Sequence, residues 1–194
     1  MRVVRNNVFE TNSSSIHSIA ISKNEVPNIS GQTIYFGSGE YGWDHSCVTD
    51  TAAYLHTAIV GISTPVEYEY RINKIKNVLD KYNVKYKFEP VKYTKYSWDP
   101  DLEYVEFVNT DGYIDHVSEC RDMVNALVEN EDLLLRYLFS DSCIYTGNDN
   151  EDYEYDMCNC ADPTIWDRNE NDNYVQLPNS NYDPEHYDYF MKGN

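Results

Sequence analysis

The sequence predicts an α+β fold with a largely antiparallel sheet, about four helices and an acidic, tyrosine-rich C-terminal extension. Its strand-like and helical segments follow the order β-β-β-α-α-β-β-α-α-β, which does not alternate single strands with helices in the regular βαβ manner. Beyond residue 147 the composition shifts to Asp, Asn, Glu and Tyr. We therefore expect a core domain over residues 1–146 and an extension over residues 147–194. Because the extension contains many aromatic residues, we expect at least part of it to pack on the core.

The first half of the chain combines short strands with two helices. Runs rich in β-branched residues predict strands over residues 2–9, 16–22 and 33–36. An apolar stripe at helical spacing predicts a helix over residues 49–62, which Thr49 or Asp50 can cap. Pro65 interrupts this pattern, and a second helix, with apolar residues on one face and lysines on the other, is expected over residues 67–82.

The second half returns to strands before a second helix pair. Alternating and apolar runs predict strands over residues 84–88, 102–108 and 143–145, with Val91 and Tyr93 continuing the first of them. Apolar faces predict helices over residues 117–128 and 131–139. Asp115 precedes the first of these helices and is expected to be its N-cap.

Charge is distributed very unevenly along this chain. The formal net charge is −18, and residues 101–194 hold 4 Lys/Arg against 23 Asp/Glu, whereas residues 1–100 hold 11 against 10. The second half is therefore a strong source of negative field. Direct binding to nucleic acid requires clustered Lys and Arg, so the total charge argues against it.

Targeting signals and cysteine usage indicate the compartment. Residues 1–20 lack the continuous apolar core of a signal peptide, and no segment approaches the roughly 20 apolar residues that a membrane helix requires. The five cysteines are an odd number, which we interpret as reduced thiols. We expect a protein of the host-cell cytoplasm without membrane contact.

The densest cluster of small polar residues lies between two expected strands, at residues 11–18. Such a cluster is typical of a hydrogen-bonded turn. Its hydroxyls, amides and histidine also suit a phosphate or another anion, and a nucleophilic serine with His17 as base and Glu10 as orienting acid is a further alternative. The residues of this alternative ligand site are Asn12, Ser13, Ser14, Ser15 and His17, with Trp43 and His45 as further candidates.

Gly37, Gly39 and Gly42 match the spacing of a dinucleotide-binding loop that follows a strand. The expected helix begins well after Gly42, so a pyrophosphate would lack the helix N-terminus that normally binds it. Glu40 and Asp44 would also repel a phosphate. We interpret this segment as a loop of glycine turns with aromatic packing anchors.

Cysteine and histidine spacing offers a metal hypothesis. Cys158 and Cys160 form a C-x-C pair, and Cys143 with His186 would complete a Cys3His zinc site. No second cysteine pair supports this site, and buried free thiols account for the same residues. We therefore predict no metal and no cofactor.

Carboxylates stand beside aromatic residues in two segments of the extension, residues 149–156 and 183–189. On a folded surface this pattern would imitate the phosphates and base faces of a nucleic acid and would steer the protein toward a basic groove, more weakly as salt increases. The alternative is a solvated acidic surface that only aids solubility. The expected partner-binding residues are Asp149, Glu151, Asp152, Tyr153, Glu154, Tyr155, Asp156, Asp183, Glu185, Tyr187, Asp188 and Tyr189.

Three short segments resemble a group of small uncharacterised proteins from phages and low-GC Gram-positive bacteria. The first is Val8-Phe9-Glu10-Thr11-Asn12-Ser13-Ser14-Ser15-Ile16-His17-Ser18, and the others are residues 39–43 and 146–150. The resemblance brings no established activity. It implies a phage or mobile-element setting, in which small acidic inhibitors of host defence enzymes are common.

These patterns favour a binding protein over an enzyme. We expect an anti-CRISPR-like inhibitor that mimics nucleic acid and whose partner is a host nucleic-acid-binding protein or ribonucleoprotein effector, with no direct contact to nucleic acid. The alternative is a small-ligand or nucleotide-binding enzyme that uses the serine-rich turn.

Overall fold

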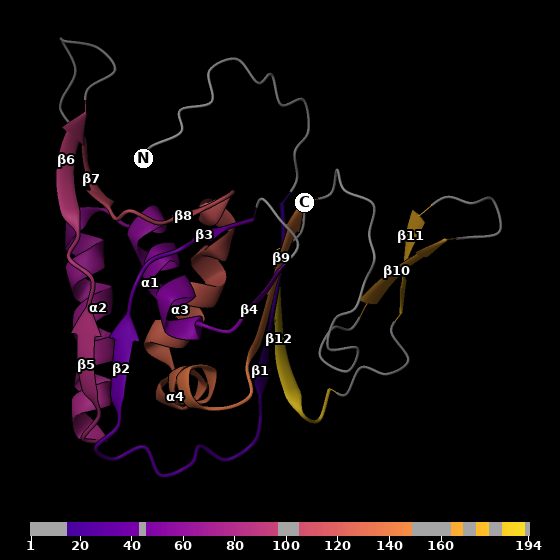
Figure 1. The fold of residues 1–194 in the computed structure, drawn as a ribbon, viewed down its shortest axis with the longest axis horizontal. Helices are drawn as coiled ribbons and strands as arrows, with labels where there is room; N and C mark the ends of the chain where they lie inside the picture. Colours follow the sequence, from indigo (N-terminus) through magenta and orange to yellow (C-terminus); the bar gives the residue numbers. More distant parts are fainter. Residues whose placement is uncertain are drawn as a thin grey trace.

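A four-stranded antiparallel sheet and a group of helices dominate the described part of the chain (Figure 1). The computed structural model describes residues 15–42, 46–96, 105–148, 164–168, 174–178 and 184–192. The predicted α+β class with a largely antiparallel sheet is confirmed. The sheet has the order β12-β1-β9-β4, with β12 at Tyr187–Lys192, β1 at Ser15–Ser22, β9 at Cys143–Asn148 and β4 at Ser46–Val48.

The helices lie on one side of this sheet, and α1, α3 and α4 separate it from the strand pair β2–β5 (Figure 1). The helical segments are α1 (Thr51–Ile62), α2 (Pro65–Lys81), the 3-10 turn η1 (Val117–Cys120), α3 (Arg121–Glu129) and α4 (Glu131–Phe139). Two pairs are parallel, β2 (Thr33–Phe36) with β5 (Lys85–Phe88) and β3 (Glu40–Tyr41) with β8 (Tyr113–Ile114). Two are antiparallel, β6 (Lys92–Tyr96) with β7 (Val105–Asn109) and β10 (Thr164–Arg168) with β11 (Tyr174–Pro178).

The β2–β5 pair is parallel because α1 and α2 separate its two strands along the chain. A connection through helices lets the chain return in the same direction, which a short turn cannot do. The sequence likewise predicts a helix pair between these two strands. The inner face of the pair is fixed by Phe36 and Phe88, whose stacked rings have centroids 4.4 Å apart.

Local capping chemistry sets where the first helix pair begins. Of the two candidate caps for α1, Asp50 takes the role, and its side chain accepts a hydrogen bond from Ala53 N at 2.9 Å. The next helix begins at Pro65, two residues earlier than predicted, because Thr64 and Glu67 form a capping box around it. Proline is well tolerated at the first helical position, where its missing N–H has no intrahelical acceptor to bond.

The predicted N-cap role of Asp115 is wrong. His116 precedes η1 in a left-handed conformation with φ of 51°, and no side chain caps this turn. Asp115 is instead buried and accepts a hydrogen bond from the Tyr113 hydroxyl at 3.2 Å. The predicted helix 117–128 begins as a tight 3-10 turn, η1, before α3.

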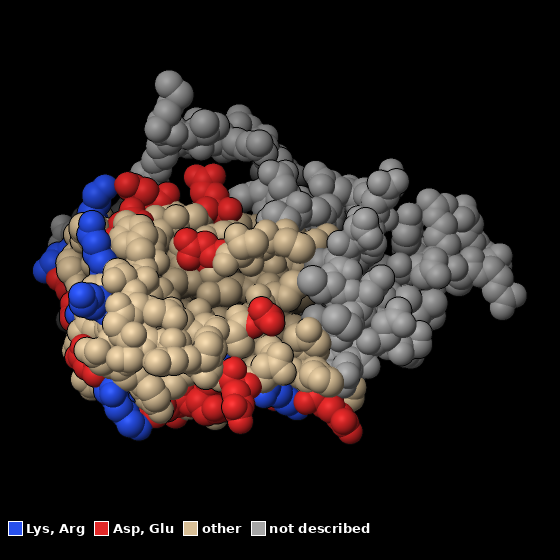
Figure 2. Space-filling model, turned by 60° about the horizontal axis from the view of Figure 1, so that its bottom comes forward, with Lys and Arg blue, Asp and Glu red and all other residues tan. Residues whose placement is uncertain are grey.

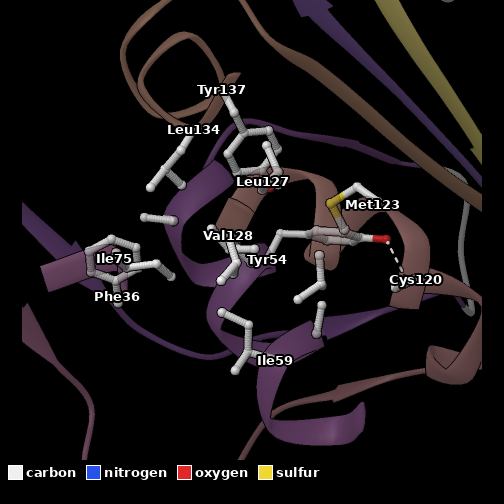
Figure 3. Packing of buried hydrophobic residues seen from close by; sticks show 14 of the residues in the cluster. Phe36, Tyr54, Ile59, Ile75, Cys120, Met123, Leu127, Val128, Leu134 and Tyr137 are labelled. Atoms are coloured by element: carbon white, nitrogen blue, oxygen red, sulfur yellow. Dashed lines mark hydrogen bonds between the residues drawn. The ribbon is translucent and has the colours of Figure 1, made fainter. Parts of the chain in front are cut away.

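The core lies between the helices and the sheet. Tyr54 of α1 and Tyr137 of α4 are its largest fully buried side chains, and the labelled leucines of α3 and α4 pack around them in Figure 3. Tyr137 donates its hydroxyl hydrogen bond to Thr51 O at 2.8 Å, so the polar end of this buried ring is satisfied. Among the described residues, no helix has the length and apolarity that crossing a membrane requires.

The last strand ties residues of the predicted extension to the core. All of β12 pairs antiparallel with β1, from His17 opposite Lys192 to Ser22 opposite Tyr187. Arg136 of α4 adds an ion pair to Asp188 at 2.9 Å and donates to Ser22 O at the same distance. Backbone pairing with β1 and the ion pair with Arg136 therefore both hold β12 on the core.

Candidate functional site

The histidine of the serine-rich segment lies inside the protein. His17 is fully buried, and its Nδ1 lies 2.7 Å from the hydroxyl of Tyr54. The same hydroxyl lies 3.6 Å from Cys120 Sγ, as Figure 3 shows. Burial raises the pKa of Tyr54 well above its ordinary value of 10.0, so the phenol stays protonated. We call these three residues the His17 cluster.

A glycine brings the loop after β2 against the His17 cluster. Gly42 has φ of +101°, and a Cβ at this position would lie 2.9 Å from Asp115 Cβ and 3.1 Å from His17 Nε2. Only glycine combines that backbone conformation with so close an approach. The third glycine of the dinucleotide-like motif thus closes the loop onto β1 and β8.

The first glycine of that motif is held by a buried histidine. His56 Nδ1 lies 2.7 Å from Gly37 O, and its Nε2 lies 3.1 Å from the Tyr68 hydroxyl. Burial lowers the pKa of His56 below its ordinary value of 6.5, which favours the neutral ring. Because α1 begins only at Thr51, after β4, the loop also lacks the helix that a dinucleotide site requires.

No hydrogen-bond partner of His56 could be predicted from the sequence, so sequence reasoning missed its contacts with Gly37 and Tyr68. The available signal is its position within the apolar stripe of α1, since a histidine placed on a buried helix face must find hydrogen-bond partners.

The residues of the alternative ligand site are only partly described. The backbone of Ser15 opens β1 opposite Asn148. The contact of the His17 ring with the Tyr54 phenol suits a core histidine better than a general base. The remaining members, Asn12, Ser13, Ser14, Trp43 and His45, lie outside the described residues.

The predicted zinc ligands divide between described and undescribed segments. Cys143 opens β9, and His186 lies in an exposed turn before β12. Cys158 and Cys160 lie outside the described residues. Within the part of the chain that the structure describes, no group of three or more His, Cys, Asp or Glu side chains is arranged to hold a metal ion.

Acidic residues gather around β3, β8 and the start of α3. Glu40 stands opposite the exposed Tyr113 in the β3–β8 register, and Asp111 precedes that strand. His116 Nδ1 lies 3.6 Å from Glu119 in η1, and Asp122 follows in the first turn of α3. We call the exposed residues Glu40, Tyr113, Glu119 and Asp122 the acidic strip, which excludes Asp111 because Lys92 pairs with it at 3.3 Å.

The acidic strip lies at the end of the fold where the acidic extension begins. Asn148, the last residue of β9, pairs with Ser15 at the start of β1. Two residues further along β1, the His17 ring meets Gly42 at the end of β3. The predicted segment 149–156 therefore follows directly from the same end of the fold, although its own residues lie outside the described ones.

Tyrosine hydroxyls bond carboxylates repeatedly on the described surface. Tyr70 donates to Glu129 at 2.8 Å and Tyr82 donates to Glu131 at 2.7 Å. Lys74 and Lys81 pair with the same two carboxylates at 3.0 and 2.7 Å. The acids at the α3–α4 junction are thus neutralised by lysines from α2, which concentrates the surplus negative charge elsewhere.

The second predicted partner-binding segment is described from residue 184 onward. Glu185 is exposed, Tyr187 opens β12, and the backbone of Tyr189 pairs with Ala20. Asp188 forms ion pairs with Arg136 and, at 3.6 Å, with Lys23. This carboxylate therefore already serves the docking of β12. Asp183 and the whole first segment (Asp149, Glu151, Asp152, Tyr153, Glu154, Tyr155 and Asp156) lie outside the described residues.

Comparisons with known proteins assign this chain to no family. No family model matches it, and neither a curated protein nor a solved structure is similar to it at the level required for a match.

Proposed function

We propose that this protein is an acidic binding protein that occupies the basic groove of a host nucleic-acid-binding defence enzyme, in the manner of an anti-CRISPR inhibitor. The observation that carries the proposal is the acidic strip at the end of the fold from which the segment 149–156 continues. We expect the acids and tyrosines of that segment to act together with the acidic strip. We place its action in the host cytoplasm.

The physical basis is imitation of a nucleic acid. Carboxylates of the acidic strip stand in for phosphates, and exposed rings such as Tyr113, 48% accessible, stand in for base faces. A surplus of negative charge over residues 101–194 steers the protein toward a positive groove and accelerates association at low salt.

Competition with DNA for a purified, guide-loaded CRISPR nuclease tests the proposal. The wild-type protein should displace labelled target DNA, more effectively at low than at high salt. The variant Glu119→Gln/Asp122→Asn should inhibit roughly twofold to thirtyfold less, because each lost surface charge contact contributes about 0.2–1 kcal/mol. A second variant, Glu151→Gln/Asp152→Asn/Glu154→Gln/Asp156→Asn, should weaken inhibition further and flatten its salt dependence.

The matched control is Glu25→Gln/Asp141→Asn, which removes the same charge from exposed positions in the β1–β2 and α4–β9 connections. These connections lie at the opposite end of the fold from β3 and β8 (Figure 1). This control should inhibit as the wild type does. Equal weakening by both two-residue variants would show a general effect of net charge and would contradict a groove-binding surface. The absence of inhibition across representative effector classes would overturn the proposal itself.

A further inference from the structure

Lysines are concentrated in one stretch of this acidic chain. Residues 74–95 contain seven lysines and only two acidic residues, Asp80 and Glu89. The stretch runs from α2 through β5 to β6. Figure 2 shows most of the visible Lys and Arg along the side of the molecule where these elements lie. The fold therefore keeps this positive charge on one side.

Four of these lysines are offset by nearby carboxylates. Lys74 and Lys81 pair with the α3–α4 junction, as described above, and Lys92 and Lys95 pair with Asp111 and Glu106 at 3.3 and 2.6 Å. Lys76 and Lys87 lie instead over aromatic rings, those of Phe88 and Tyr35. Uncompensated positive charge is thus centred on β5.

The outer face of the β2–β5 pair presents this charge beside an exposed ring. Lys85 and Lys87 point outward from β5, because their burial alternates with that of the half-buried Tyr86 and Phe88. In the parallel register Lys87 stands opposite Tyr35, which is 49% exposed to solvent. Lys85 stands opposite the exposed Thr33. The Lys87 ammonium lies 5.6 Å from the centre of the Tyr35 ring.

We propose that this outer face, formed by Tyr35, Lys85 and Lys87, is a binding site for single-stranded nucleic acid. Proteins that bind single strands combine cationic side chains for the backbone with aromatic rings for the bases. A phosphate draws the Lys87 ammonium off the ring, and the exposed Tyr35 ring then receives a base. Lys85 contacts the next phosphate along the strand.

The fold makes this site compatible with the strongly negative chain. The β2–β5 pair lies across α1 from the four-stranded sheet that holds the C-terminal strand (Figure 1). At an ionic strength of about 0.1 M, charges more than about 10 Å apart are largely screened from one another. A layer of helix has about this thickness, so the acidic residues of the described C-terminal strand oppose binding at this face only weakly at such salt. The site is independent of the groove-binding function proposed above.

Fluorescence anisotropy of a labelled single-stranded oligonucleotide, titrated with the full chain, tests this site. We expect binding at moderate salt, with affinity falling by a logarithmic slope of about 0.7 for each phosphate contact, or about 1.4 for two lysines. Lys85→Gln/Lys87→Gln should abolish most of that slope. Tyr35→Ala should weaken binding about fivefold or more but keep the slope, because a base stacks on the ring without neutralising charge.

The matched control is Lys92→Gln/Lys95→Gln, which removes the same charge from lysines already paired with acids. It should bind within about twofold of the wild type, since carboxylates already offset these lysines. Because all substituted lysines are exposed, circular dichroism should show every variant folded. The absence of oligonucleotide binding, equal loss in both double variants, or stronger binding to anionic phospholipid vesicles than to the oligonucleotide would each overturn this assignment. None of these measurements involves a nuclease, so failure here leaves the groove-binding proposal separately testable.

Discussion

Tyrosine is abundant in this protein, and its hydroxyl has two different roles. In the core, the hydroxyl of Tyr54 joins His17 and Cys120, which lets a large ring be fully buried without an unsatisfied polar atom. On the surface, the hydroxyls of Tyr70 and Tyr82 bond carboxylates that lysines also contact. Hydrogen bonds from these side chains hold the pKa of Glu129 and Glu131 below the ordinary value of 4.5.

At the same scale, Gly42→Ala should destabilise the protein more than Gly31→Ala. Both glycines have positive φ, of +101° and +81°, so both substitutions incur roughly 1–2 kcal/mol of backbone strain. Only the alanine at position 42 would also clash with His17 and Asp115. Such overpacking lowers the free energy of unfolding by a further amount of about 1–3 kcal/mol. Urea unfolding measures both losses. Equal losses would show that Gly42 is needed for its conformation alone.

At the scale of elements, β12 is the part of the acidic extension whose docking the structure explains. Its backbone pairs with β1, and Asp188 contacts Arg136 and Lys23. Arg136 also bonds Asp132 one helical turn away at 2.8 Å. One arginine therefore connects α4, the end of β1 and the C-terminal strand. Substitution of each of its two carboxylate partners tests whether this arginine contributes to the docking of β12.

Asp188→Asn should loosen β12 while Asp132→Asn should not. Both substitutions remove one carboxylate from Arg136, but only the first removes a contact between β12 and the core. This half-buried ion pair contributes about 1 kcal/mol, which corresponds to about a fivefold loss of protection from amide hydrogen exchange. Amide hydrogen exchange, measured over residues 187–192 in both variants, tests this prediction. Similar protection in both variants would show that backbone pairing alone docks the strand.

At the scale of the whole molecule, the charge imbalance of the sequence is partly resolved by contacts between its two halves. Lysines of α2, from the neutral first half, reach the acids of α3 and α4, from the strongly negative second half. Their stabilisation is present above the ordinary carboxyl pKa of 4.5 and is lost as pH falls below it, because the folded-state pKa of each carboxyl is lowered.

Acidification should also destabilise the protein through His56. Its pKa is lowered in the folded state, so below the ordinary value of 6.5 the unfolded chain binds more protons and stability falls, by up to about 1.4 kcal/mol per pH unit. Acidification also relieves repulsion among the excess acids, which raises the free energy of unfolding. The wild type must therefore be compared with His56→Gln, in which that repulsion is the same. The free energy of unfolding of the wild type should fall relative to the variant as pH drops below 6.5. A constant difference would contradict the pKa shift.

Local patterns predicted much of the fold because they depend on neighbouring residues. Apolar periodicity indicated all four α-helices, and a polar residue before α1 indicated its cap. Prediction failed at Asp115, because His116 precedes η1 in a left-handed conformation, which apolar periodicity does not indicate. The same limit applies to the candidate site, where His17 was identified as important but its burial beside Tyr54 and Cys120 was not.

The sequence by itself determined the α-helices of the described residues, the α+β class and the surplus of negative charge, because these follow from composition and short-range periodicity. Only the tertiary structure decided which charges meet. It paired four lysines of residues 74–95 with acids and left Lys85 and Lys87 on one sheet face beside Tyr35. Electrostatic interactions depend on distance in space and on the salt between charges, and neither can be read from separation along the chain.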